Sequence, residues 1–212
     1  MYDLLIFDLD GTLIDSAGDI ADALNHALAA HGLPTHSDAA IIPMIGKGVT
    51  HLVTQAVGPA HLEHLEAVTA TFRHYYREHP VGRTRLYPGV AETLAGLGPA
   101  SKAIATNKPG YLARSIVELL GLAGHFFAVL GDEDMVRRKP DPQVVHDLRA
   151  RVGAAPERTL FIGDSPIDAA TAHAAGVDLC LVSYGYADRA ELDALPARYR
   201  VDDFRALARL VP

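Results

Sequence analysis

Short apolar runs alternate with amphipathic stretches through most of this chain, and this alternation restricts the fold more than any other feature. Each run has the length of a buried strand, and each amphipathic stretch has the length of a helix. The expected strands are Leu4–Phe7, Lys102–Thr106, Ala128–Gly131, Thr159–Gly163 and Leu179–Ser183, and the helices between the last four are Gly110–Leu120, Pro142–Val152 and Pro166–Ala175. Such alternation predicts an α/β fold with a Rossmann-like parallel sheet covered by helices on both faces.

Residues at the ends of the expected helices support these boundaries. Asp141-Pro142 and Ser165-Pro166 each place a capping residue before a proline at the first helical position. Gly176 follows a helix as a C-terminal stop. The tail is expected to contain a short helix after Asp188, an extended segment at Arg200–Asp202 and a last amphipathic helix that ends near Pro212.

Residues 15–82 interrupt the alternation, because they contain no apolar run of strand quality. Ser16 and Asp19 resemble a capping box at the start of the first helix of this segment. The predicted organisation is a core of residues 1–14 and 83–212, into which a helical cap domain of residues 15–82 is inserted. The helices expected in the cap are Asp15–Ala30, Val49–Val57 and His61–Tyr76.

Charge and composition argue against several classes of protein. The formal net charge of −7 argues against nucleic acid or an anionic membrane as the main partner. No apolar run approaches the ~20 residues that cross a bilayer, and the first residues do not resemble a signal peptide, so we expect a cytoplasmic location. The single cysteine, Cys180, lies in an apolar run and is expected to be a core residue. Either a monomer or a homodimer is compatible with the sequence.

The first strand ends in two carboxylates, Asp8 and Asp10, followed by glycine and threonine. Residues i and i+2 of an extended segment point the same way, so the two carboxylates are expected to lie side by side. Their repulsion would be relieved by a shared cation, and Mg²⁺ prefers oxygen ligands. One aspartate is then suited to act as a nucleophile and the other as a general acid and base. The alternative is a simple turn, because Asp-Gly after a strand is also a hairpin signal.

Three further strand ends carry polar groups that belong to the same edge of such a sheet. Thr106-Asn107-Lys108 offers a hydroxyl, an amide and backbone N–H groups to a phosphate, although a polar helix cap would explain it equally. A rigid Lys139 facing the aspartates would neutralise a phosphoryl group, and a solvated basic loop is the alternative. Helix capping explains Asp168 well and Asp164 less well. Together these residues favour Mg²⁺-assisted phosphoryl transfer.

The four strand ends resemble the four motifs of the haloacid dehalogenase superfamily. The chain is similar to the phosphatase branch over essentially its whole length, and residues 15–82 resemble that family's cap domain of the first type. The matching motifs are Asp8-Leu9-Asp10-Gly11-Thr12, Thr106-Asn107, Lys139-Pro140 and Gly163-Asp164-Ser165-Pro166-Ile167-Asp168. Within the superfamily the chain most resembles the phosphoglycolate phosphatases, through Phe7–Ser16, Ile45–Val49, Tyr87–Val90 and Arg138–Pro142.

The resemblance implies hydrolysis of a small phosphorylated metabolite, with 2-phosphoglycolate as the expected substrate, in two steps. Asp8 would attack phosphorus and form an aspartyl-phosphate, while Asp10 would protonate the leaving oxygen and later activate water. Mg²⁺ would be held by the Asp8 carboxylate, the Asp10 backbone carbonyl and Asp164. The cofactor expected from the resemblance is therefore Mg²⁺, and Mn²⁺ or Co²⁺ stay open as metals that support activity.

The same resemblance assigns roles to the residues around the phosphoryl group. Thr106, Asn107 and Lys139 would bind its oxygens, and Asp168 would orient Lys139 or the waters of the metal. In the cap, Lys47 lies between two glycines and is the candidate that would bind a substrate carboxylate, against the alternative of an exposed lysine in a turn.

Several other functions remain compatible with the motifs. A dehalogenase has no need of a second acid at Asp10. Phosphatases for pyrophosphate or sugar phosphates and a sugar-phosphate mutase would keep all four motifs, whereas a silent phosphate sensor would usually have lost one of them. His61 and His64 have helical i, i+3 spacing, but no third metal ligand is evident near them.

Overall fold

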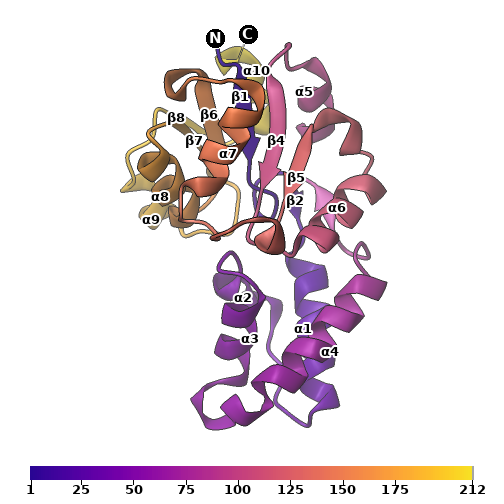
Figure 1. Cartoon of the computed structure of the whole chain (residues 1–212). Coiled ribbons are helices and arrows are strands. Elements are labelled where there is room, and N and C mark those ends of the chain that lie inside the picture. Colours follow the sequence, from indigo (N-terminus) through magenta and orange to yellow (C-terminus); the bar gives the residue numbers. More distant parts are fainter. Residues whose placement is uncertain (212) are drawn as a thin grey trace.

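The computed structural model describes residues 1–211, in which a six-stranded sheet lies above a group of helices (Figure 1). The strand order is β5-β4-β1-β6-β7-β8, and every neighbouring pair is parallel. The strands are β1 (Leu4–Phe7), β4 (Ser101–Ala105), β5 (Ala128–Leu130), β6 (Thr159–Gly163), β7 (Asp178–Val182) and β8 (Tyr199–Val201). The chain builds outward from β1 on both sides, so the order reverses beside β1, where α/β sheets bind ligands.

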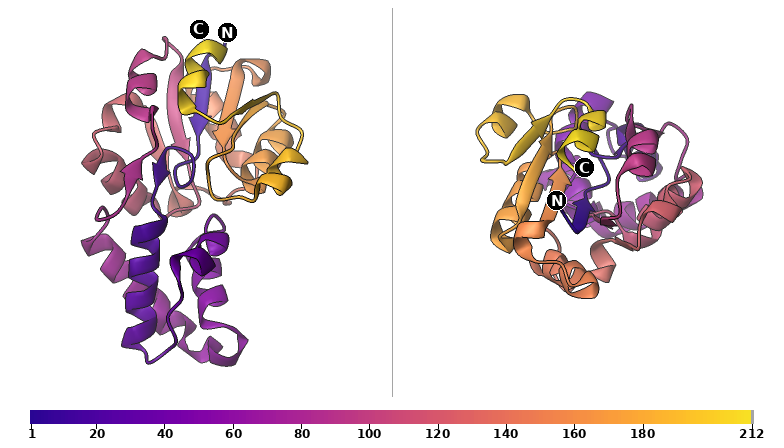
Figure 2. Two further views of the ribbon diagram at one scale, coloured as in Figure 1. Left: turned by 180° about the vertical axis from the view of Figure 1, so that it is seen from behind. Right: turned by 90° about the horizontal axis from the view of Figure 1, so that it is seen from above.

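Helices cover both faces of the sheet (Figure 2), as the alternating sequence predicts. Successive side chains of β1 point to opposite faces, so Leu5 and Phe7 enter one hydrophobic core while Leu4 and Ile6 enter the other. The first core includes residues of α5 (Val90–Gly96), α6 (Gly110–Leu119) and α10 (Leu207–Leu210), and the second includes residues of α7 (Gln143–Val152), α8 (Pro166–Ala175) and α9 (Arg189–Asp193).

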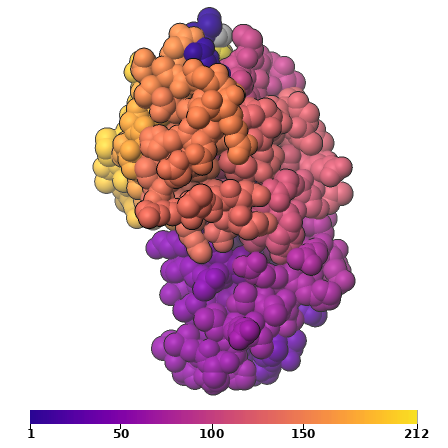
Figure 3. Space-filling model, in the orientation of Figure 1, coloured from indigo at the N-terminus to yellow at the C-terminus, as the bar shows by residue number. Residues whose placement is uncertain are grey.

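A helical cap packs against the carboxyl ends of the strands (Figures 1 and 3). It contains α1 (Ala17–Ala30), α2 (Asp38–Ile41), α3 (Val49–Val57) and α4 (Leu65–Glu78). The two connections to the core lie side by side, because β2 (Ile14–Asp15) pairs antiparallel with β3 (Arg85–Leu86). The exact domain limits given above stay a prediction, and Pro212 lies outside the described residues. Within residues 1–211, no helix is both long and apolar enough to cross a membrane.

The structure reproduces most of the expected elements and corrects some of them. Four elements have the predicted bounds: Leu4–Phe7, Val49–Val57, Thr159–Gly163 and Pro166–Ala175. Ser165 caps α8 by accepting a hydrogen bond from the Asp168 N–H. The helix predicted over His61–Tyr76 begins only at Leu65, because a 3₁₀ segment with a non-helical His61 precedes it. α7 begins at Gln143 instead of Pro142, and the Asp141 carboxylate accepts a hydrogen bond from the Gln143 N–H.

The predicted capping box at the start of α1 is wrong. The Ser16 side chain makes no capping hydrogen bond and instead donates to the Asp10 carboxylate. The Asp19 carboxylate accepts hydrogen bonds from the backbone of residues 82–84, on the other connection between cap and core. Both side chains therefore join the cap to the core.

Candidate active site

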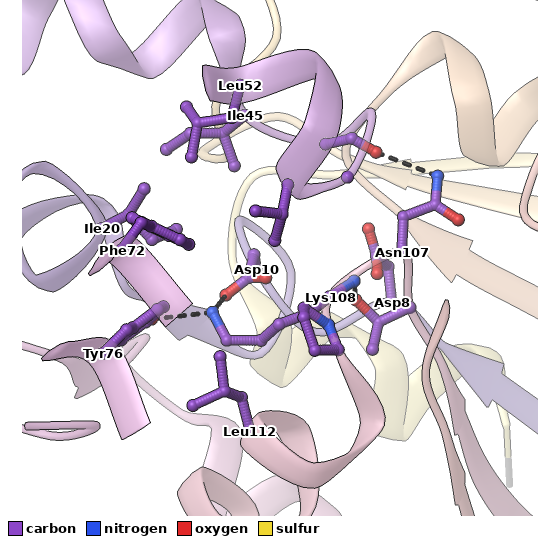
Figure 4. Close-up of a pocket in the computed structure, with 15 residues that line it drawn as sticks. Asp8, Asp10, Ile20, Ile45, Leu52, Phe72, Tyr76, Asn107, Lys108 and Leu112 are labelled. Atoms are coloured by element: carbon purple, nitrogen blue, oxygen red, sulfur yellow. Dashed lines mark hydrogen bonds and ion pairs between the residues drawn. The ribbon is translucent and has the colours of Figure 1, made fainter. Parts of the chain in front are cut away.

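The predicted site residues of the core meet at the carboxyl ends of β1, β4 and β6, where the cap covers the sheet. Asp8 and Asp10 follow β1, Thr106 follows β4, and Asp164 follows β6. A pocket opens at this place between core and cap (Figure 4). It is lined by Asp8, Asp10, Ile20, Ile45, Gly46, Gly48, Val49, Leu52, Phe72, Tyr76, Thr106, Asn107, Lys108, Pro109 and Leu112.

Lys139 faces Asp8, as the sequence predicts, but its second partner is Asp168 and not Asp10. Its Nζ lies 3.0 Å from Asp8 Oδ1 and 2.7 Å from Asp168 Oδ1, and only 1 % of its side chain is exposed. The other oxygen of Asp168 accepts hydrogen bonds from the backbone N–H of Asp164 and from the N–H and hydroxyl of Ser165. Both oxygens of Asp168 are thus occupied within the protein, which holds Lys139 against Asp8.

Asp8, Asp164 and Asp168 form a buried acidic cluster, with carboxylate oxygens within 4.8 Å of one another. Burial raises the pKa of Asp8 to about 7; Lys139 opposes this rise, and the charges of Asp168 and Asp10 add to it. Burial and the charges of Asp168 and Asp8 also raise the pKa of Asp164 well above its usual range. Such crowding of buried carboxylates fits a divalent cation, because a cation favours their charged forms.

Asp164 is held in a defined orientation beside Asp8. Its Oδ1 accepts a hydrogen bond of 2.9 Å from the Thr12 hydroxyl, and its Oδ2 accepts one of 2.9 Å from the Tyr186 N–H. The Tyr186 hydroxyl in turn accepts hydrogen bonds from the backbone N–H groups of Ser16 and Ala17, at the entrance to the cap. Tyr186 therefore supports both the acidic cluster and the first connection to the cap.

Asp10 has two partners from different parts of the chain. Its Oδ1 accepts a hydrogen bond of 2.5 Å from the Ser16 hydroxyl and lies 2.9 Å from the Nζ of Lys108. Lys108 is also bonded to the Tyr76 hydroxyl of α4, at 2.8 Å (Figure 4). Burial alone would lower the pKa of Lys108, but the Asp10 carboxylate and the Tyr76 hydroxyl outweigh it, so that pKa is raised and the ammonium stays charged.

Asn107 connects the core to the cap loop. Its Nδ2 donates to the backbone carbonyls of Gly46, at 3.0 Å, and of Lys139, at 3.1 Å, while its Oδ1 accepts from the Lys139 N–H. The Thr106 hydroxyl is buried and accepts a hydrogen bond from the N–H of Lys108. Both residues line the pocket, so they lie where a phosphoryl group is expected.

Lys47 does not line this pocket. Its side chain is exposed, and its backbone carbonyl accepts a 3.4 Å hydrogen bond from the Arg138 guanidinium. The neighbouring Gly46 and Gly48 do line the pocket, so the predicted loop is correctly placed although the lysine itself points elsewhere in this arrangement. Its role in substrate binding stays a prediction.

Two pocket residues escaped the sequence analysis. Lys108 stands in the Thr106-Asn107-Lys108 run, but nothing in the run assigned it a partner. Tyr76 gave no signal beyond its place in an amphipathic stretch, because its contact with Lys108 depends on how the cap sits on the core.

Comparison with known proteins identifies the family of this chain. The sequence profile described as haloacid dehalogenase-like hydrolase matches residues 5–182, most of the chain. The chain belongs to this family. The predicted superfamily and the prediction of a hydrolase are therefore confirmed.

Similar proteins of the haloacid dehalogenase-like family carry names that agree with a phosphoric monoester hydrolase. The chain is 37 % identical over 213 residues to a phosphoglycolate phosphatase of Rhodospirillum rubrum, covering 96 % of this chain and 88 % of that protein. It is 40 % identical to one of Cereibacter sphaeroides, with 86 % and 85 % covered. A crystal structure of a "predicted phosphoglycolate phosphatase" from Haemophilus somnus superposes with a TM-score of 0.93 at 31 % identity, covering 100 % of this chain and 98 % of that one.

Proposed function

We propose that this protein is a Mg²⁺-dependent phosphatase that hydrolyses a small phosphomonoester, 2-phosphoglycolate, through an aspartyl-phosphate on Asp8. The observation that carries the proposal is the contact of Asp8 with the buried Lys139 beside two further buried carboxylates. The names of the relatives support the choice of substrate. The motifs predicted the same chemistry.

The metal would be held by the Asp8 carboxylate, the Asp10 backbone carbonyl and Asp164. When bound, Mg²⁺ would neutralise charge on the phosphoryl oxygens, so that an anionic nucleophile can approach an anionic substrate. Asp168 is a positioning residue in this proposal, because its oxygens are engaged by Lys139, Ser165 and the backbone.

In the first step a carboxylate oxygen of Asp8 forms a bond to phosphorus, and the bond from phosphorus to the ester oxygen breaks. Asp10 gives a proton to that oxygen, which leaves as an alcohol. Lys139, the Thr106 hydroxyl and the backbone N–H of Asn107 bind the phosphoryl oxygens during the transfer, and this positioning supplies much of the acceleration.

In the second step water attacks phosphorus and gives a proton to Asp10, and the Asp8–phosphorus bond breaks to release inorganic phosphate. The Ser16 hydroxyl, at 2.5 Å from Asp10, fixes the orientation of that carboxylate in both steps. The cap covers the pocket, which would exclude bulk water while the leaving group is selected.

Phosphate release tests this function. Wild-type protein should release phosphate from 2-phosphoglycolate with Mg²⁺ and not with EDTA. Asp8→Asn should lower kcat by about 10⁴-fold or more, because the nucleophile is lost. Asp193→Asn, at an exposed position of α9, is the matched control and should behave as wild type.

Trapping the intermediate tests the mechanism separately. Acid quench and borohydride reduction convert an aspartyl-phosphate to homoserine, so mass spectrometry should find homoserine at Asp8 and nowhere else. Preference for pyrophosphate or a hexose phosphate would keep the mechanism and refute the substrate. If no ester in the panel released phosphate, the proposed function would be wrong.

A further inference from the structure

Lys108 is a buried cation on the leaving-group side of the pocket, and the proposed two-step chemistry gives it no role. Only 3 % of its side chain is exposed. Its Nζ bonds to Asp10 of the core and to Tyr76 of the cap, and it lies 4.6 Å from the centre of the Tyr76 ring. Burying an ammonium costs free energy unless all of its donors are bonded. In the part of the chain that the structure describes, Lys108 has only these two hydrogen bonds, so its burial suggests a further partner.

Lys108 supplies the positive charge of this pocket. Among the residues that line the pocket, Lys108 carries the only cationic side chain. The walls near it are apolar and come from both core and cap (Figure 4). The labelled apolar residues are Ile20, Ile45, Leu52, Phe72 and Leu112. Between apolar walls, a charge interaction is stronger than it is in water.

Lys108 also keeps bonding capacity for a ligand. An ammonium has three N–H donors. Within residues 1–211 its hydrogen-bond acceptors are Asp10 and Tyr76, which leaves one donor available. The Tyr76 hydroxyl of α4 holds the lysine from the side of the cap, so core and cap together fix the position of this cation.

Distance links Lys108 to the reacting oxygen. In the proposed function Asp10 contacts the ester oxygen of the substrate, and Lys108 Nζ is 2.9 Å from Asp10 Oδ1. A carboxylate two covalent bonds beyond the ester oxygen, as in 2-phosphoglycolate, therefore lies within reach of Nζ.

We propose that Lys108, held by Tyr76, is the specificity-determining residue that binds the carboxylate of the substrate, so that the site selects short phosphomonoesters whose carboxylate is two covalent bonds from the ester oxygen. The inference rests on the proposed function and adds the residue that recognises the leaving group. The sequence prediction gave this role to Lys47, which is the rival in the test.

The test compares 2-phosphoglycolate with ethyl phosphate, which has the same two-carbon length and no carboxylate. Lys108→Met keeps the side-chain stem and removes the charge. It should lower the ratio of kcat/KM for 2-phosphoglycolate to that for ethyl phosphate by about 30-fold or more, because neutral and charged ligands would then be bound alike. Lys108→Arg should retain much of the ratio, and Tyr76→Phe should lower it by a smaller factor.

Equal losses on both esters in Lys108→Met would overturn the inference, since Lys108 would then serve only Asp10. A ratio that falls in Lys47→Met and not in Lys108→Met would assign the carboxylate to the cap loop instead. Pyrophosphate as a third substrate distinguishes a general preference for anionic leaving groups from recognition of a carboxylate.

Calorimetry separates this inference from the proposed function. Binding of 2-phosphoglycolate and ethyl phosphate is measured in the Asp8→Asn background, with and without Lys108→Met. If Lys108→Met weakens the binding of 2-phosphoglycolate more than that of ethyl phosphate, the role of Lys108 is supported. This holds even if wild-type protein hydrolyses neither ester, because the lack of hydrolysis would refute only the proposed function. Equal weakening of both ligands would refute the inference.

Discussion

Asp168 contacts Lys139 and holds it beside Asp8. One of its oxygens binds Lys139 Nζ at 2.7 Å, and the other is held by Ser165 and the backbone at the start of α8. The aspartate is fully buried, so the pair is shielded from solvent. Lys139 therefore approaches Asp8 from a fixed direction.

The amide variant Asp168→Asn tests this positioning role at the residue scale. It keeps the shape of the side chain and removes the charge that holds Lys139, so we expect kcat at saturating Mg²⁺ to fall by about 10- to 100-fold. The rate of phosphate release measures the fall. Ser165→Ala removes one hydrogen bond to the same carboxylate and a helix cap, so its main cost should be about 1 kcal/mol of stability. A kcat like that of wild type in Asp168→Asn would contradict the role.

Residue types at strand ends predicted most of the polar site. Lys139 was expected to face Asp8 and Asp10; it contacts Asp8, whereas Asp10 pairs with Lys108 and Asp168 is the second partner of Lys139. The meeting of these groups was foreseeable because parallel strands end at one edge of the sheet. The pairing of Lys108 with Tyr76 lay beyond prediction. It depends on which side of α4 faces the core, and the sequence of a helix does not state how that helix docks.

At the scale of elements, the two connections between core and cap are tied together by Asp19 of α1. Its carboxylate accepts hydrogen bonds from the N–H groups of Gly82, Arg83 and Thr84 and from the Thr84 hydroxyl. Burial alone would raise the pKa of Asp19, but these hydrogen bonds, led by that of Thr84, lower it below its ordinary 3.8.

Asp19→Asn should lower the free energy of unfolding by about 2–4 kcal/mol, because an amide replaces a carboxylate that accepts several hydrogen bonds. A pKa that is lower in the folded state stabilises the protein above the unfolded value of 3.8, and this contribution is lost as the pH falls through the folded pKa. The difference in Tm between wild type and variant should therefore be full at pH 7 and shrink below pH 4. Asp22→Asn, at an exposed ion pair with Arg83, is the control and should cost less than about 1 kcal/mol. A pH-independent difference would refute the charge argument.

Elements with a strong hydrophobic pattern were predicted with the correct first and last residues, and elements with a weak pattern were not. Thr159–Gly163 is an apolar run that the core buries on both faces. β8 is only three residues long, and its middle residue, Arg200, is exposed, so its pairing with β7 is decided by the sheet already built. The opening of α1 was misread because Ser16 and Asp19 bond across space instead of along the helix.

For the molecule as a whole, the core and the cap share one hydrophobic interior. A single cluster of buried residues contains Phe7 of the sheet, Leu112 of α6 and the cap residues Ile20, Leu52 and Phe72. The polar site lies above the carboxyl ends of β1, β4 and β6 and is closed from the other side by the cap. Heat should therefore unfold core and cap in one transition, and a ligand in the pocket should stabilise both.

Orthovanadate, a phosphate mimic, tests this coupling together with Mg²⁺. A ligand at 100 times its Kd adds about 2.7 kcal/mol to the folded state, which corresponds to a rise in Tm of roughly 5–10 °C for a chain of this size. We expect this rise only when both Mg²⁺ and vanadate are present, because the buried carboxylates repel an anion until a cation offsets them. Scanning calorimetry should show one peak that moves as a unit in wild type and in Asp193→Asn. Two separate peaks, or a full shift with vanadate and no metal, would contradict the argument that one ligand site joins the cap to the core.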